Sequence, residues 1–160
     1  MQAQRPPKSP SLPKRPMGGF TLIELAIAMV IAALLVAVAL PSFLDSIRKG
    51  RRSEAMAGLT TLQQEQERWR SNNQAYSESL TNLRVTSPTN PGRYYTLAVK
   101  SGSGTATGYE AIADGTGSSQ ANDGDCAKLA VKVERGSITY ASCRTCSSFT
   151  YSSTNACWAR

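Results

Sequence analysis

The feature that most constrains this chain is a stretch without charge, Leu25–Leu44, in which only Pro41 and Ser42 are not apolar. As a helix, twenty residues extend about 30 Å, which is the thickness of the hydrocarbon core of a bilayer. The stretch is therefore long enough to cross a membrane. The chain after Asp45 is polar, so we expect it to form a separate domain in water.

The residues that precede this stretch form a basic, proline-rich segment. Residues 1–16 contain five prolines, and the first nineteen residues hold four cations and no acid. Such a composition cannot build a core. The four cations supply more than half of the net charge of +7, so the basic balance of the whole chain says little about nucleic acid.

Three interpretations of the N-terminal region compete. An ordinary signal peptide would be cut after Ala37-Val38-Ala39, but the apolar stretch exceeds the usual 7–15 residues. A plain single-pass anchor explains the length and the basic flank, yet it gives Glu24 no role, and a carboxylate beside lipid by default marks function. In the third interpretation, cleavage after Gly19 leaves a free α-amino group on Phe20, one helical turn from Glu24. That ammonium can pair with Glu24 of a neighbouring subunit, which would offset the cost of burying each charge and set the axial register.

The run Gly19-Phe20-Thr21-Leu22-Ile23-Glu24-Leu25, followed by the apolar stretch, resembles the class III signal of type IV prepilins. The resemblance implies cleavage between Gly19 and Phe20 by a membrane prepilin peptidase, and N-methylation of Phe20. It also implies roles in filament assembly for Glu24, Thr21 and Pro41. A leader of nineteen residues is long for this family, which leaves the start codon open.

The same resemblance implies a domain organisation and a location. Residues 1–19 would be a cleaved leader, residues 20–44 a transmembrane and filament-core helix, and residues 45–160 a periplasmic or extracellular head. The chain would sit in the inner membrane with its N-terminus in the cytoplasm, and later in a pilus on the cell surface. The implied partners are prepilin peptidase, other pilin subunits in a helical filament, the inner membrane and the pilus assembly machinery.

The resemblance implies a structural subunit of a type IV pilus, a minor pilin in pilus assembly, adhesion or twitching motility. One alternative is a pseudopilin of a type II secretion system, and another is a DNA-binding minor pilin for natural transformation. We do not expect nucleic acid as a partner, because a DNA site needs exposed basic and aromatic residues on the head. The basic cluster Arg48, Lys49, Arg51 and Arg52 is interpreted instead as a solvated helix face or a membrane-surface anchor.

The predicted fold is α+β. Apolar residues keep to one helical stripe after the apolar stretch (Ile47, Met56, Leu59, Leu62 and Trp69), which predicts one helix from about Phe20 to Asn72. The cluster Pro88, Pro91 and Gly92 ends the helical pattern. Four short strands follow, at 94–100, 109–113, 129–133 and 138–141, with a hairpin turn at 134–137. We expect an antiparallel meander on the second half of the helix, with a disulfide-closed C-terminal loop.

The four cysteines, all in the last 35 residues, suggest disulfides made outside the cytoplasm. Sequence alone leaves three pairings open. The C-terminal part resembles PilE-type minor pilins in three features: a Cys-x-x-Leu run, a hairpin with Gly, and a terminal Cys-Trp. This resemblance implies a disulfide between Cys126 and Cys157. Because Cys143 and Cys146 are close in sequence, we expect the second disulfide to join them. A zinc site would need a second Cys-x-x-Cys pair, and a thioredoxin-like motif would need a βαβ context.

No enzyme, metal or cofactor is expected. The chain has no His, which removes the commonest general base and a common metal ligand, and it shows no nucleophile–base pair and no phosphate loop. The run Asn122-Asp123-Gly124-Asp125 is interpreted as a turn rather than a calcium site.

Overall fold

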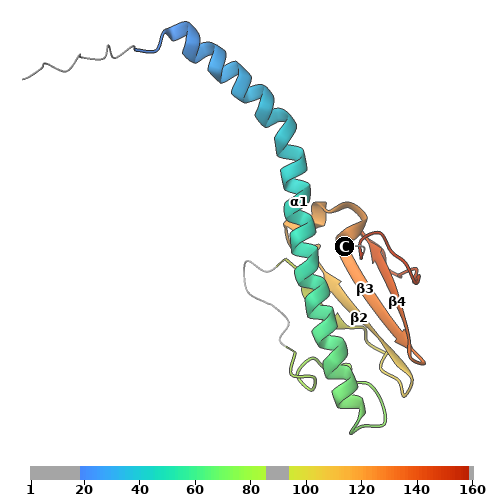
Figure 1. Cartoon of the computed structure of the whole chain (residues 1–160). Helices are drawn as coiled ribbons and strands as arrows, with labels where there is room; N and C mark the ends of the chain where they lie inside the picture. The colour runs from blue at the N-terminus through green and yellow to red at the C-terminus, as the bar shows by residue number, and fades with distance from the viewer. Residues whose placement is uncertain (1–18, 86–93, 159–160) are drawn as a thin grey trace, which may run out of the picture. The chain divides into compact units, whose positions relative to one another are not determined.

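The computed structural model describes residues 19–85 and 94–158 (Figure 1). The predicted leader, apart from Gly19, and the cluster Pro88, Pro91 and Gly92 lie outside these ranges. The chain divides into two compact units, Met1–Leu40 and Pro41–Arg160, each described by itself below. We call the described part of the second unit the head.

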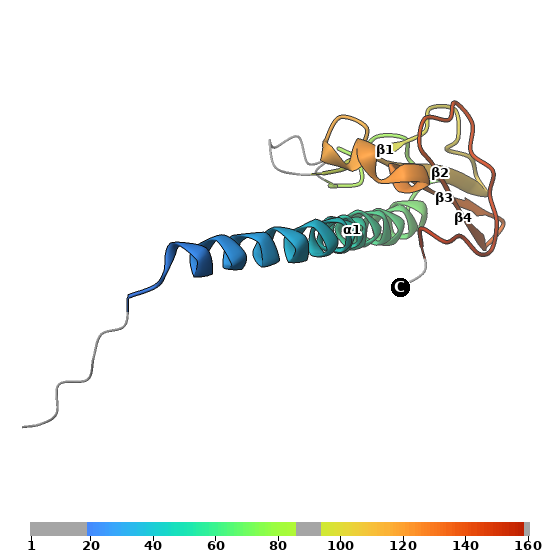
Figure 2. The same cartoon turned by 90° about the horizontal axis from the view of Figure 1, so that it is seen from above.

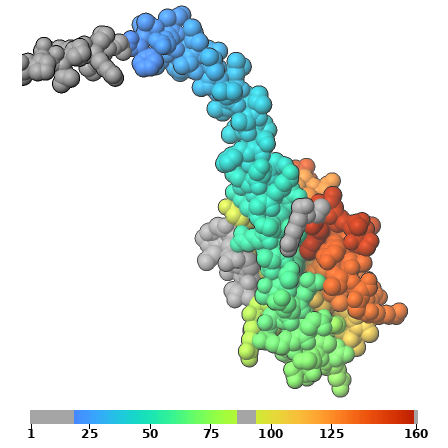
Figure 3. Space-filling view, viewed as in Figure 1, coloured from blue at the N-terminus to red at the C-terminus, as the bar shows by residue number. Residues whose placement is uncertain are grey.

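One helix, α1 (Leu22–Arg70), begins in the first unit and continues through the head. Thr21 precedes it as a cap, because its Oγ1 accepts a hydrogen bond from the Glu24 backbone N–H at 3.2 Å. No described residue outside the helix covers the helix of the first unit on the face that Figure 3 shows. Its large apolar side chains are exposed, including Phe20 at 84% and Leu22 at 88%. Among the described residues, α1 is the one helix long and apolar enough to cross a membrane.

The head contains an antiparallel sheet in the order β1-β2-β3-β4. The strands are β1 (Thr96–Val99), β2 (Gly108–Asp114), β3 (Lys128–Glu134) and β4 (Ser137–Cys143), and two short 3₁₀ helices, η1 (Ser119–Asn122) and η2 (Gly124–Cys126), precede β3. At the β3–β4 hairpin, Arg135 and Gly136 have φ of 50° and 79°. Positive φ at both central residues matches a type I′ turn, whose twist suits two-residue hairpins.

The predicted fold class is confirmed, with small shifts at the element ends. The predicted first strand starts too early, since Tyr94 and Tyr95 precede β1. The other three strands extend further than predicted because their pairing continues to the outer pairs Gly108↔Glu134 and Lys128↔Cys143. The helix starts and ends two residues inside the predicted bounds.

The core lies between the head part of α1 and one face of the sheet (Figure 2). Ala55, Leu59 and Leu62 of α1 are buried against alternate residues of the central strands, as expected for a sheet with one face covered by a helix. On the strands, these residues are Tyr109, Ala111 and Ala113 of β2 and Leu129, Val131 and Val133 of β3. Gly58 permits close packing here, because a Cβ at that position would lie 3.0 Å from Leu97 Cδ1.

A buried glutamine connects α1 to the segment that follows it. Gln66 is fully buried, its Nε2 donates to the Ser77 carbonyl at 2.6 Å, and its Oε1 accepts from the Ser77 N–H at 2.9 Å. The amide nitrogen and the amide oxygen of Gln66 thus each have a hydrogen-bond partner in the interior. The pair holds residues 71–77 against the helix end, where the cleft described below is formed.

Candidate functional site

The N-terminal motif residues lie at the exposed start of α1. Gly19, Phe20 and Thr21 precede the helix, and Glu24 is the acid in its first turn. A carboxylate at this position interacts favourably with the helix dipole. Glu24 is exposed, so its charge is available to a group outside the chain.

Pro41 lies inside α1, which is helical on both sides of it. A proline has no N–H and cannot donate to the carbonyl four residues earlier, so the helix lacks one hydrogen bond to Ala37. The boundary between the two compact units falls at Leu40 and Pro41. The proline therefore marks the transition from the exposed apolar helix to the head.

Both disulfides have the pairing that we expected. Cys126 is bonded to Cys157, with their Cα atoms 5.5 Å apart, and Cys143 is bonded to Cys146, with a Cα separation of 5.8 Å. The longer bridge attaches the final segment to η2, and next to it the Trp158 indole donates to the Ala141 carbonyl at 3.1 Å. The C-terminal segment is thus held both covalently and by packing.

The basic cluster is not the uniformly solvated face that we expected. The Arg52 side chain is only 12% exposed, and its guanidinium makes two contacts with the Asp123 carboxylate, at 2.8 and 3.2 Å. The Arg51 guanidinium lies 3.7 Å from the centre of the Tyr94 ring and donates to Ser119 Oγ at 2.7 Å. Of the cluster, Lys49 best fits the prediction, in an exposed pair with Asp45. The two arginines connect the head part of α1 to Tyr94 and to the η1 region.

The run Asn122-Asp123-Gly124-Asp125 forms the junction of η1 and η2, with Gly124 at a φ of 55°. This is the turn that we predicted. Burial raises the pKa of the Asp123 carboxyl, and the facing Arg52 guanidinium opposes that shift. No cluster of three or more His, Cys, Asp or Glu suited to a metal occurs in the described ranges.

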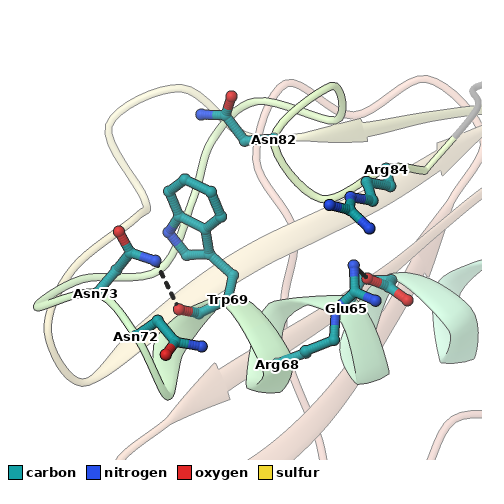
Figure 4. A pocket seen from close by; sticks show the side chains of 7 residues that line it. All are labelled: Glu65, Arg68, Trp69, Asn72, Asn73, Asn82 and Arg84. Atoms are coloured by element: carbon teal, nitrogen blue, oxygen red, sulfur yellow. Dashed lines mark hydrogen bonds and ion pairs between the residues drawn. The ribbon is translucent and has the colours of Figure 1, made fainter.

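A polar cleft of about 260 Å³ lies beside the end of α1 (Figure 4). Its wall combines one aromatic ring, several amides and three charged groups. These side chains come from the last turns of α1, the turn that follows and the loop toward β1: Glu65, Arg68, Trp69, Asn72, Asn73, Asn82 and Arg84. Trp69, which we assigned to the apolar stripe, packs against the core but is only partly buried. Its ring extends into the cleft.

Some polar side chains of the cleft are held by contacts within the protein, and others are available to bind a ligand. Asn73 Nδ2 donates to the Trp69 carbonyl at 2.8 Å, and Arg68 pairs with Glu65 at 2.6 Å. The side chains of Asn82 and Arg84 and the indole N–H of Trp69 make no hydrogen bond with any other described residue. Two arginines and one glutamate give the cleft a net charge of +1. The cleft thus offers an aromatic face beside free donors and acceptors.

Two loops of the sheet lie at the same end of the head as the C-terminal end of α1 (Figure 1). The Arg70 guanidinium donates to the Ala106 carbonyl, at 3.1 and 3.2 Å, and so connects the helix end to the β1–β2 loop. The Arg135 N–H of the β3–β4 turn donates to the Thr107 carbonyl at 2.8 Å. We call this end, formed by the cleft, residues 101–107 and the β3–β4 turn, the loop end of the head. Sequence reasoning missed it, although Trp69 at a predicted helix end beside Asn72-Asn73 was a usable signal.

Two family models match the chain. Residues 14–40 match the prokaryotic N-terminal methylation motif. Residues 41–130, more than half of the chain, match the family described as type IV minor pilin ComP, DNA uptake sequence receptor. No curated protein matches the chain.

These matches confirm the resemblance to type IV pilins and the minor-pilin assignment. They name no secretion pseudopilin. The exclusion of nucleic acid as a partner is at odds with the family's description as a DNA receptor. Because the methylation motif matches the apolar helix and the ComP model matches most of the head, the chain belongs to the type IV minor pilins of the ComP family.

Proposed function

We propose that this minor pilin binds DNA on the cell surface and thereby takes part in DNA uptake. The observation that carries the proposal is the match of residues 41–130 to a family of DNA uptake sequence receptors. The loop end supports it, because exposed arginines and a partly exposed tryptophan lie there together. Basic and aromatic side chains in one place are what binding of nucleic acid requires.

The arginines of the loop end are suited to phosphate contacts. Arg84 and Arg135 are exposed, and neither pairs with a carboxylate in the part of the chain that the structure describes. A guanidinium binds phosphate through parallel N–H groups. Because each neutralised phosphate releases counterions, binding should weaken steeply as salt rises.

An Arg84→Gln variant should bind short duplex DNA more weakly than the unmodified chain. Loss of one phosphate contact should also lower the slope of log affinity against log salt by about 1. Both chains, full-length and in detergent micelles, are titrated with labelled duplex at several salt concentrations. Arg144→Gln is the matched control, since Arg144 is exposed and follows β4 at the end of the sheet away from the hairpin. An unmodified chain that does not bind duplex even at low salt would contradict the proposal.

The N-terminal residues support a proposal for how the subunit enters the filament. Prepilin peptidase cleaves between Gly19 and Phe20, Phe20 is N-methylated, residues 20–44 form the filament core, and residues 45–160 form the head. The exposed apolar side chains of the first unit support this, since a neighbouring helix or lipid would cover them. The methylated ammonium of Phe20 pairs with Glu24 of the next subunit.

Glu24→Ala should lower incorporation into pili while leaving membrane insertion and cleavage intact. Removing the carboxylate makes the helix more apolar, so insertion does not suffer, but the neighbour's ammonium loses its partner. The measurements are the amount of the subunit in sheared pili and its N-terminal sequence in membranes. Normal incorporation would reject the pairing, and an N-terminus at Leu40 would reject cleavage after Gly19.

A further inference from the structure

We propose that the cleft around Trp69 binds one unpaired base of a DNA strand. The inference rests on the proposed DNA binding and assigns a base-reading site within it. The volume of about 260 Å³ lies just below the range of about 300–1,000 Å³ that is usual for small-molecule pockets. Space of this size suits a single flat ring.

The aromatic face needed for stacking is held in place by the fold. One part of the Trp69 side chain packs against the core, and the residue's carbonyl accepts from Asn73 Nδ2 at 2.8 Å. The ring therefore keeps its orientation in the cleft (Figure 4). Because every base has a π-face, stacking on such a ring provides affinity for any base.

The free polar groups of the cleft are complementary to a nucleotide. The Asn82 amide has a donor and an acceptor without a partner in the described ranges, and an Asn side chain can pair with N6 and N7 of adenine. Arg84 lies on the same side of the cleft, where it can meet a phosphate (Figure 4). Arg68 is already held by Glu65, so Arg84 is the cation that remains available. An amide, a cation and an aromatic face match the base edge, the phosphate and the base ring, respectively.

The base must be unpaired to reach Trp69. Inside a duplex, both faces of a base are stacked on its neighbours, and a protein reaches the face only when the nucleotide is extruded or single-stranded. Extrusion costs least where the base has no partner. The cleft should therefore favour DNA that contains a bulged or single-stranded base.

Three duplexes of one sequence test the inference with the full-length chain in detergent micelles. One duplex is fully paired, one carries a bulged adenine, and one carries an abasic residue in the same bulge. The chain should bind the bulged adenine about 5- to 150-fold more tightly than the abasic bulge, which corresponds to about 1–3 kcal/mol for stacking one base. The position of the bulge and the backbone charge are the same in these two probes, so their ratio of affinities reports the contribution of the base.

Substitutions in the cleft should change that ratio selectively. Trp69→Ala should bring it close to 1, whereas Trp69→Phe should keep part of it, because a smaller aromatic face remains. Measured against a fourth duplex that carries a bulged cytosine, Asn82→Ala should reduce the preference for the bulged adenine. Asn122→Ala is the matched control, since Asn122 is also exposed but lies in η1. Thermal unfolding by circular dichroism shows which variants are folded. If Trp69→Ala unfolds the head, Asn82→Ala still tests the site, because it removes only an exposed side chain.

The outcomes separate this inference from the proposed function. Equal affinity of the unmodified chain for the bulged adenine and the abasic bulge, with measurable binding of the paired duplex, overturns the base site and leaves DNA binding intact. Failure to bind any of the three probes overturns both. Quenching of tryptophan emission that is lost in Trp69→Phe, and that a neutral oligosaccharide causes but the bulged duplex does not, would assign the cleft to a glycan and overturn the inference.

Discussion

Asp123→Ala is expected to lower the free energy of unfolding of the head by about 3–5 kcal/mol. Asp123 is 4% exposed at its side chain, and both of its carboxylate oxygens face Arg52, itself 12% exposed. Removing the carboxylate leaves a guanidinium in a nearly dry environment without its counter-charge. Gln120 Nε2, which also approaches Asp123 at 3.3 Å, loses an acceptor as well.

Thermal or urea unfolding of the full-length chain in detergent measures this loss. Asp125→Ala is the matched control, because Asp125 is exposed two residues away, and an exposed substitution should change stability by no more than about 0.5 kcal/mol. Arg52→Met combined with Asp123→Leu should recover much of the stability, since an apolar pair can replace a buried ion pair. Asp123→Ala with the stability of its control would show that the pair is unimportant.

Opening the longer disulfide is expected to cost about 3–4 kcal/mol. The Cys126–Cys157 bridge closes a loop with a sequence separation of 31, whereas Cys143–Cys146 spans a separation of 3. The entropy that a cross-link removes from the unfolded chain rises with loop length, so the shorter bridge should contribute less than about 2 kcal/mol. Opening the longer bridge also releases Trp158, whose ring lies 4.6 Å from that of Tyr140.

The two double variants, Cys126→Ser/Cys157→Ser and Cys143→Ser/Cys146→Ser, are compared after export to the periplasm. The first should be digested by protease at concentrations that leave the second and the unmodified chain intact, and its unfolding midpoint should be the lowest. Peptide mapping without reductant checks the remaining bridge in each variant. Greater lability of the Cys143→Ser/Cys146→Ser variant would reverse the ranking.

The sequence by itself determined the features that depend on neighbouring residues. The apolar stretch Leu25–Leu44 and the periodic residues after it predicted one helix, and α1 is continuous through both. The run 134–137 predicted a hairpin, because its turn needs positive φ at two successive residues and Gly136 adopts that conformation freely. The motif at Gly19–Glu24 predicted a type IV pilin, and the family matches confirm that class.

Only the tertiary structure decided which side chains meet. Arg52 and Asp123 are 71 residues apart in sequence, and a basic cluster on a helix has the same local pattern whether water or a carboxylate surrounds it. Likewise, Trp69 follows the helical period of the core residues, but its exposure depends on where the loop with Asn82 and Arg84 passes. The spacing of apolar residues predicts which residues share one face of a helix, whereas their burial depends on what packs against that face. The cleft of this pilin, built from a helix end, a turn and a loop, therefore exists only once the chain is folded.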